Sequence, residues 1–312
     1  MQPAAATNPA QIRLRCPRCG TGIPDSQCPA CRFVVTVGRG IVRALSPESQ
    51  AHLTGFMDEY ERIREAEGRG SERGDFYLGL PYVDASGRDA GQWHVRARSH
   101  DYVLRHLLAG TGHRPGAMVL DLGAGNCWMS YRLSLAGYRP CAVDLLTNDS
   151  DGMGAARHYR AHLPALFPRF QASFGQLPFA DDQFDAAVFN ASFHYSEDGE
   201  AVLRESLRCV KPGGMVIISD TPWYPREEDG RRMLAERQSA FLRRHGTAGS
   251  SIAMLGFLTD AWLQGMQRAL SIQWEVHRPW YGLAWALRPA VAKLRGRRPP
   301  SRFRLWVARK PA

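Results

Sequence analysis

The sequence predicts an α/β fold, with a doubly wound, mostly parallel sheet of seven strands preceded by a small cysteine-rich module. Two observations support this prediction. After residue 92, short apolar runs bounded by turn residues alternate with segments of helical periodicity, the pattern of parallel strands joined by helices. Near the N-terminus, four cysteines stand in two close pairs. We therefore expect a module over residues 1–45, a helical linker over 46–91 and the main domain over 92–312.

Length and composition indicate what kind of protein this is. With 312 residues the chain can bury a large core. It lacks an apolar run of about eighteen residues, so no transmembrane helix is predicted, and residues 1–10 lack the pattern of a secretory signal. Seven cysteines, four of them in two close pairs, suit a reducing compartment better than a disulfide framework. These features predict a cytoplasmic protein and leave its oligomeric state open.

The cysteine module contains two Cys-x-x-Cys turns, Cys16 to Cys19 and Cys28 to Cys31, separated by eight residues. Each turn can direct two thiolates at one metal ion, and two turns complete a tetrahedral shell that favours Zn²⁺. A redox dithiol would need a single pair beside a βαβ unit. A segment with so few apolar side chains also needs a metal to hold a fold. The sequence therefore predicts a structural zinc site with all four cysteines as ligands.

Two helices are predicted between the module and the first strand of the main domain. Residues 46–67 form a polar helix, because Ser46 is a favourable N-cap and Pro47 suits the first turn. Residues 93–109 have the apolar spacing of an amphipathic helix that leads into the first strand.

The main domain opens with a strand, a glycine turn, a helix and a second strand. Met118 to Leu122 is the first apolar strand, and Gly123 and Gly125 allow a tight turn that a ligand can approach closely. Helical spacing follows over 127–135. The second strand ends at Asp144, nineteen positions after Gly125, where a carboxylate can accept both hydroxyls of a ribose.

This arrangement predicts a nucleoside pocket. A dinucleotide site would need a third glycine three residues after the second, but Trp128 occupies that position. We therefore expect a ligand without a pyrophosphate.

Three motifs carry a resemblance to class I S-adenosylmethionine (SAM) methyltransferases. The first is the glycine turn with its strand-end acid, and the second is Leu177-Pro-Phe-Ala-Asp-Asp-Gln-Phe-Asp185, similar to the family's approach to the fourth strand. The third, Glu205 to Gly214, is similar to the helix and turn before the fifth strand. The set resembles the group that includes quinone-biosynthesis methyltransferases. Over roughly residues 92–310 it implies a Rossmann-like methyltransferase domain with SAM as donor.

The resemblance also implies which residues hold the donor. Asp144 would bind the ribose, Asp121 would orient the loop or the amino group, and the glycine turn would let SAM lie against the backbone. Ser173 stands where the family has an adenine-binding aspartate, and the backbone N–H of Phe174 could serve adenine. On the helix over 93–109, Arg98 could pair with the methionine carboxylate. A solvated helix face is the alternative for Arg98.

Residues at the end of the fourth strand are expected on the acceptor side of SAM. Asn190 is a candidate cofactor contact. His194 is the candidate general base, because imidazole titrates near neutral pH, and Tyr195 could position a phenol or hydroxyl. A residue that packs beneath the cofactor is the alternative reading of His194.

Five further strands complete the expected sheet, at residues 169–174, 184–189, 215–219, 271–277 and 303–309. The last two should form the antiparallel hairpin that the resemblance implies. An insertion over 226–258, with a basic helix and a loop containing Gly246 and Gly249, lies between the fifth strand and the next helix. Insertions here form lids over the acceptor in the resembled family, so substrate choice is expected to depend on this segment.

The net charge of +10 comes from the C-terminal segment. Ten of the 40 Lys and Arg residues lie between Arg278 and Lys310, where no Asp or Glu occurs, so the rest of the chain carries 30 residues of each sign. Apolar and aromatic residues over 280–287 adjoin these cations. The combination suits an interfacial helix on an anionic membrane or phosphate contacts with RNA. A surface lid with solvated arginines is the alternative.

Three functions remain open at this point. The first is a SAM-dependent methyltransferase of a small or lipid-like molecule, as the quinone-type motifs imply. The second is an RNA base methyltransferase, because residues 33–41 after the cysteines are similar to zinc ribbons that are fused to or partner RNA and small-molecule methyltransferases. Such a ribbon could be a scaffold or could read a substrate or partner. The third is a SAM-binding scaffold without catalysis.

Overall fold

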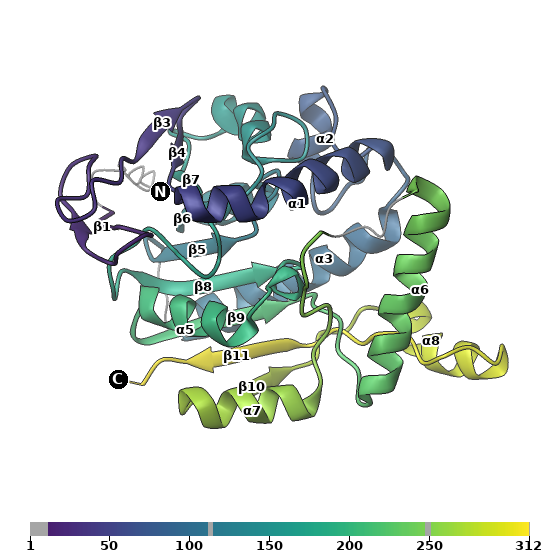
Figure 1. The fold of residues 1–312 in the computed structure, drawn as a ribbon. Helices are drawn as coiled ribbons and strands as arrows, with labels where there is room; N and C mark the ends of the chain where they lie inside the picture. Colours follow the sequence, from purple (N-terminus) through teal and green to yellow (C-terminus); the bar gives the residue numbers. More distant parts are fainter. Residues whose placement is uncertain (1–11, 112–114, 247–250, 312) are drawn as a thin grey trace.

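The structure is a computed structural model that describes residues 12–111, 115–246 and 251–311 (Figure 1). Residues 1–10 and Gly249, to which expectations were attached above, lie outside the described residues. The strands are β1 (Leu14–Arg15), β2 (Gly22–Ile23), β3 (Thr36–Gly38), β4 (Ile41–Arg43), β5 (Met118–Leu122), β6 (Arg139–Asp144), β7 (Arg169–Gln171), β8 (Phe184–Asn190), β9 (Val210–Ser219), β10 (Trp274–His277) and β11 (Leu305–Arg309).

The helices lie between these strands and at the carboxyl ends of several of them. The α-helices are α1 (Pro47–Ala66), α2 (Gly74–Gly79), α3 (Ala90–Tyr102), α4 (Trp128–Leu135), α5 (Gly199–Cys209), α6 (Glu227–His245), α7 (Asp260–Leu270) and α8 (Leu283–Leu294). A π-helical segment, η2 (Val103–Leu108), continues α3, and short 3₁₀ segments are η3 (Ala109–Thr111), η4 (Met153–His162) and η5 (Phe193–Tyr195).

One mixed sheet organises the domain, in the order β10-β11-β9-β8-β5-β6-β7-β4-β3. The seven expected strands are all present, and β10 and β11 form the expected antiparallel pair. The expected number of seven was wrong for the whole sheet, which has nine strands. The difference arises because β4 pairs in parallel with β7 through Val42 and Phe170. The hairpin β3–β4 thereby covers an edge that would otherwise be open to pairing with other chains.

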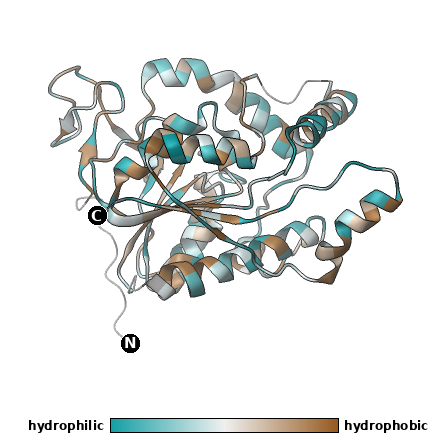
Figure 2. Cartoon of the chain, turned by 90° about the horizontal axis from the view of Figure 1, so that it is seen from below, coloured by the Kyte–Doolittle hydropathy of each residue, from teal (hydrophilic) through white to brown (hydrophobic). Residues whose placement is uncertain are grey.

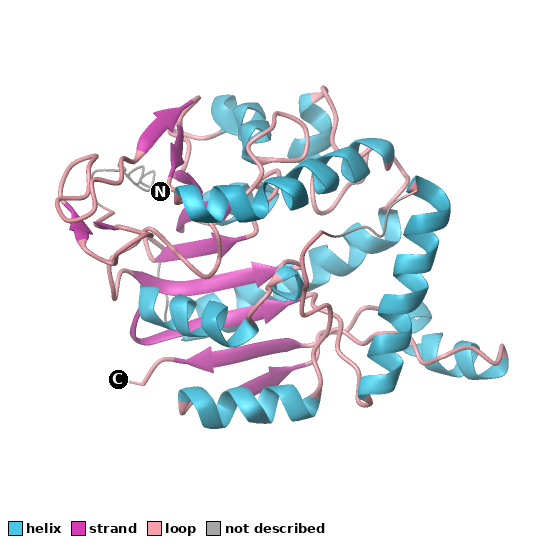
Figure 3. Cartoon of the chain, in the orientation of Figure 1, coloured by secondary structure: helices cyan, strands magenta, loops and turns pink. Residues whose placement is uncertain are grey.

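Alternation along the strands assigns side chains to the two faces of the sheet. On β5, Val119 packs into one apolar cluster, whereas Leu120 and Leu122 pack into the other. On β8, Val188 packs into the first cluster and Phe189 into the second. Helices α3 and α4 cover the first face, and α5 and α7 cover the second, so the sheet lies between two helical layers (Figure 3). Burying both faces accounts for the nearly continuous apolar runs seen in the sequence.

The predicted helix over 46–67 is confirmed as α1. The Ser46 side chain accepts a hydrogen bond from the backbone N–H of Ser49 at 3.1 Å, and Pro47 occupies the first turn. This helix buries Leu53 and Phe56 in a cluster that includes Leu146, just beyond the carboxyl end of β6. The helix over 93–109 is also confirmed, as α3 and its continuation η2.

Hydropathy follows this layering (Figure 2). Apolar colour runs along the central strands, and the surrounding helices are two-toned. Among the described residues, no helix combines the length and the apolar content needed to cross a bilayer.

Candidate functional site

A cavity of about 850 Å³ lies at the carboxyl ends of the parallel strands. This is the edge at which open α/β sheets bind ligands. Helices α1, α3, α6 and α8 contribute the remaining walls. Eight of the ten residues proposed above for SAM or the acceptor line it: Gly123, Gly125, Asp144, Ser173, Phe174, Asn190, His194 and Tyr195. Its volume is near the upper end of the range of about 300–1,000 Å³ for ligand pockets, as expected for a site that holds two ligands.

The glycine turn forms the floor of the cavity. Gly123 has a φ of +77°, and a Cβ there would lie 2.3 Å from Cβ of Ser192, so both conformation and space require glycine. Gly125 has a φ of +51°. The backbone N–H groups of Gly123 and Ala124 donate to the carbonyl of Val143 at 2.8 and 3.0 Å. The turn is therefore held rigidly against β6.

Asp144 fixes the same turn with its side chain. Its Oδ2 accepts a hydrogen bond from the Gly125 N–H and its Oδ1 accepts one from the Leu146 N–H, both at 2.8 Å. Burial raises the pKa of Asp144 to about 6. Each carboxylate oxygen keeps a further lone pair, so Asp144 can still accept two ligand hydroxyls.

Asp121, a proposed cofactor residue, does not line the cavity. It is 1% exposed, and its Oδ2 accepts a hydrogen bond from the Ser130 hydroxyl at 2.6 Å. Burial, with the nearby charge of Asp144 as a smaller contribution, raises its pKa to about 7. Asp121 thus joins β5 to α4 behind the glycine turn, where any influence on a ligand is indirect.

Asn190 and Asp220 form a polar pair at the ends of β8 and β9. The Asn190 Nδ2 donates to Oδ2 of Asp220 at 3.2 Å, and the Ser99 hydroxyl donates to Oδ1. Burial raises the pKa of Asp220 to about 6. Asp220 lines the cavity and was missed in the sequence. The sequence contained a signal for Asp220, because it directly follows an apolar strand, just as Asp144 stands at the end of β6.

The surroundings of His194 weaken the basis on which its imidazole was expected to act as a general base. Its side chain is buried, and burial, together with the charges of Arg237 and Arg96, lowers its pKa to about 3. The imidazole is therefore neutral at physiological pH and a weak base. Its Nδ1 has no hydrogen-bond partner among the described residues, so this nitrogen is available for a hydrogen bond to a ligand.

The surroundings of Tyr195, unlike those of His194, favour the ionised form of its side chain. Burial raises the pKa of its hydroxyl, but the charges of Arg237 and Arg64 and hydrogen bonds from Tyr60 and Arg237 outweigh burial, so the pKa lies below its ordinary value. The rings of Tyr60 and Tyr195 meet edge to face, with centroids 5.6 Å apart. Arg64 is paired with Asp151, whereas Arg237 has no ion pair among the described residues.

Arg96, and not Arg98, is the arginine of α3 that lines the cavity. Arg98 is exposed to solvent on another side of the helix. The Arg96 guanidinium stacks on Trp93, 4.6 Å from the ring centroid, and burial lowers its pKa. It has no ion pair in the described part of the chain. The sequence contained a signal for Arg96. Trp93 and Arg96 are three residues apart, so they lie on the same face of the helix.

The four cysteines of the module converge. Their Sγ atoms all lie within 4.8 Å of one another, with 3.4 Å between Cys16 and Cys31 and 3.5 Å between Cys19 and Cys28. A tetrahedral Zn²⁺ with Zn–S bonds of about 2.3 Å needs sulfur separations of about 3.8 Å. The donor set and spacing therefore fit zinc.

The two Cys-x-x-Cys turns of the module have the same backbone conformation and hydrogen bonding. The residue after each pair, Gly20 or Arg32, has a positive φ. Its N–H donates to the carbonyl of the first cysteine in its own turn, at 2.9 Å to Cys16 and 3.0 Å to Cys28. The thiolates are thus presented by two equivalent knuckles.

Comparison with known proteins finds a similarity in the central part of the chain. A sequence family described as "Methyltransferase domain" matches residues 120–218, which include the glycine turn, Asp144, His194 and Tyr195. The part of the chain that carries the glycine turn and the carboxyl ends of β6 and β8 is therefore similar to methyltransferase domains.

Similarity to individual proteins is partial. A demethylmenaquinone methyltransferase of Mycolicibacterium paratuberculosis is 35% identical over 122 residues, which are 38% of this chain and 48% of that protein. The enzyme of the same name from Beutenbergia cavernae is 35% identical over 127 residues, 39% of this chain and 50% of that protein. The chain therefore spans about half the length of these curated relatives.

The fold is shared more widely. The crystal structure of a candidate sarcosine dimethylglycine methyltransferase from Galdieria sulphuraria is similar to 81% of this chain and 98% of its own, with a TM-score of 0.51 and 16% identity.

Proposed function

We propose that this protein transfers a methyl group from SAM to a small aromatic acceptor that carries an ionisable hydroxyl. One observation carries the proposal. A single cavity joins a rigid glycine turn and a strand-end carboxylate to a wall of aromatic rings and arginines.

The donor end suits each part of SAM. Asp144 would accept the ribose hydroxyls, and the glycine turn would lie against the nucleoside. Ser173 and Phe174, which line the cavity beside this turn, would contact adenine. Arg96 would pair with the methionine carboxylate, since its guanidinium forms no ion pair among the described residues.

The acceptor end suits an anionic aromatic molecule. Phe56, Tyr60, Tyr195, Phe241 and Trp285 line it. The cations that lower the pKa of Tyr195 would also favour the phenolate form of an acceptor hydroxyl. The curated relatives are named for a quinone acceptor, which supports this substrate class.

The reaction is an in-line displacement at the methyl carbon. The bond from acceptor to methyl forms as the bond from sulfur to methyl breaks, and the electron pair goes to sulfur to give S-adenosylhomocysteine. The cavity must align the three atoms and exclude water. The acceptor proton would pass to Tyr195 in its tyrosinate form, which the nearby arginines favour, and from the resulting phenol to solvent water, because the neutral His194 is too weak a base to take it.

Tyr195→Phe is expected to lower kcat about 100-fold and to leave SAM affinity unchanged, because it removes a hydroxyl that acts on the acceptor only. Steady-state kinetics and SAM titration measure the two quantities. Tyr82→Phe, at a half-exposed tyrosine outside the cavity, is the matched control and should leave both unchanged. An unaltered kcat for Tyr195→Phe would refute the role of this hydroxyl.

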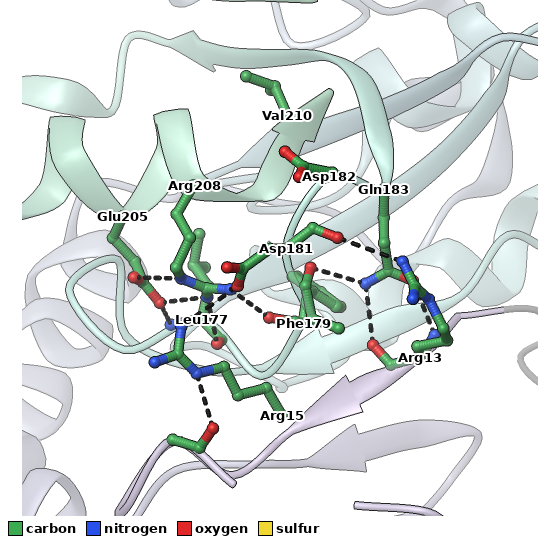
Figure 4. A network of polar contacts seen from close by, with 12 residues as sticks. Arg13, Arg15, Leu177, Phe179, Asp181, Asp182, Gln183, Glu205, Arg208 and Val210 are labelled. Carbon is green, nitrogen blue, oxygen red and sulfur yellow. Dashed lines mark hydrogen bonds and ion pairs between the residues drawn. The ribbon is translucent and has the colours of Figure 1, made fainter. Parts of the chain in front are cut away.

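We further propose that Cys16, Cys19, Cys28 and Cys31 hold a structural Zn²⁺. Two observations support a bracing role. No residue of 12–43 lines the cavity, and β1 docks on the loop before β8. In this contact the side-chain amide of Gln183 accepts a hydrogen bond from the Arg13 N–H at 2.8 Å and donates one to the Arg13 carbonyl at 2.9 Å (Figure 4).

An RNA substrate has less support. The cysteine module pairs with one edge of the sheet through β4, whereas the basic C-terminal segment adjoins β10 and β11 at the opposite edge. The two features that suggested RNA binding therefore lie on different sides of the molecule and do not form one surface (Figure 1).

The substrate class is tested with methyl-labelled SAM, incubated with the protein and either a metabolite extract or total RNA. We expect label in the organic-soluble metabolite fraction. Label in RNA would establish the RNA alternative. Saturable SAM binding without label in either fraction would favour a binding protein without catalysis.

A further inference from the structure

Helix α8 presents an apolar stripe to solvent. Leu283, Leu287, Val291 and Leu294 recur at intervals of four, four and three residues, so they share one face of the helix. Together with Trp280, just before the helix, they have exposed fractions between 40% and 87%. Helix α8 buries no residue against the rest of the chain and projects away from the sheet (Figures 1 and 2).

Cations that form no ion pair among the described residues lie at the C-terminal end of this stripe. Lys293, Arg295 and Arg297 are exposed and make no ion pair in the described part of the chain. Arg298, by contrast, is paired with Glu236 at 2.7 Å. Residues 278–310 contain ten Lys and Arg residues and no acid, so the segment that carries the apolar stripe has a surplus of positive charge.

The inner side of α8 borders the cavity. Trp285 and Arg288 line it, with the Arg288 guanidinium 3.6 Å from the centroid of the Trp285 ring. Helix α8 therefore has one side on the acceptor end of the cavity and an apolar, cationic side toward solvent.

We propose that α8 docks the protein on an anionic lipid bilayer. Leucines and a tryptophan would enter the headgroup boundary while the cations meet lipid phosphates, the arrangement of interfacial amphipathic helices. A second copy of the chain is disfavoured, because two acid-free segments repel each other. An RNA would use the cations but leave the leucines exposed. If the proposed function holds, a lipid-soluble acceptor would reach the cavity directly from the bilayer.

Sedimentation with vesicles tests the docking, using the full chain without SAM or acceptor. We expect partitioning to vesicles of equal parts phosphatidylglycerol and phosphatidylcholine, little to phosphatidylcholine alone, and weakening by salt. Leu283→Glu with Leu287→Glu should lower partitioning at least about tenfold. Exchange of Lys293, Arg295 and Arg297 for Gln should lower it about 10- to 100-fold. Leu135→Glu, at an exposed leucine on α4, should have no effect.

Three outcomes would overturn the proposal. One is no partitioning of the wild type to anionic vesicles, and another is partitioning that the leucine exchanges leave unchanged. The third is a dimer in analytical ultracentrifugation that Leu287→Glu dissociates, which would make this face a self-interface. Vesicle binding and label transfer to a water-soluble acceptor are measured separately, so failure of docking is distinguishable from failure of the proposed activity.

Discussion

Replacing Asp144 by alanine is expected to lower SAM affinity about 100-fold. Two ribose hydroxyls would lose a charged acceptor, and a hydrogen bond to a charged group is worth about 1.5–3 kcal/mol. The N–H groups of Gly125 and Leu146 would lose their acceptors as well, so the glycine turn would loosen. Equilibrium dialysis with labelled SAM measures the change.

Two further variants make this result interpretable. Asp144→Asn keeps one acceptor oxygen and should give an intermediate loss of affinity. Asp58→Ala removes an exposed carboxylate from α1 outside the cavity and should have no effect. Unchanged SAM affinity in Asp144→Ala would refute the assignment of this carboxylate to the ribose.

Cys28→Ser is expected to remove zinc and unfold the cysteine module. The apolar cluster of the module has only five buried side chains, whereas binding of structural zinc contributes about 10–16 kcal/mol in isolated zinc-binding peptides. Loss of the module would also free the edge of β7 that pairs with β4. We expect Tm to fall by at least about 10 °C, since about 1 kcal/mol corresponds to about 2–4 °C in a domain of this size.

Metal content separates this effect from general destabilisation. Elemental analysis should give one zinc per wild-type chain and none in Cys28→Ser. Cys209→Ala removes a buried core thiol that is not one of the four proposed zinc ligands, so it should lower Tm but keep the zinc. A zinc-free wild type with an unchanged Tm would contradict the structural metal site.

Local chemistry explains why much of the site was predictable. The glycine turn and the strand-end Asp144 depend on backbone conformation and on an apolar run that ends in an acid, both visible in a few consecutive residues. The cap of α1 at Ser46 is local in the same way. These features could be predicted because the residues that form each of them are neighbours in the sequence.

Features that depend on distant packing were not predictable. The pairing of β4 with β7 joins segments more than a hundred residues apart and involves strands of three residues each, which leave no distinctive pattern. The depressed pKa of His194 comes from burial and from two arginines on α3 and α6. No local sequence pattern encodes that environment.

The central claim is that the cavity at the carboxyl ends of the strands binds SAM. Calorimetric titration of the wild-type protein with SAM, and separately with NAD, tests it most directly. We expect saturable binding of one SAM per chain and no binding of NAD, because Trp128 replaces the third glycine of a dinucleotide site. Absence of saturable SAM binding, or equally tight binding of NAD, would contradict the assignment.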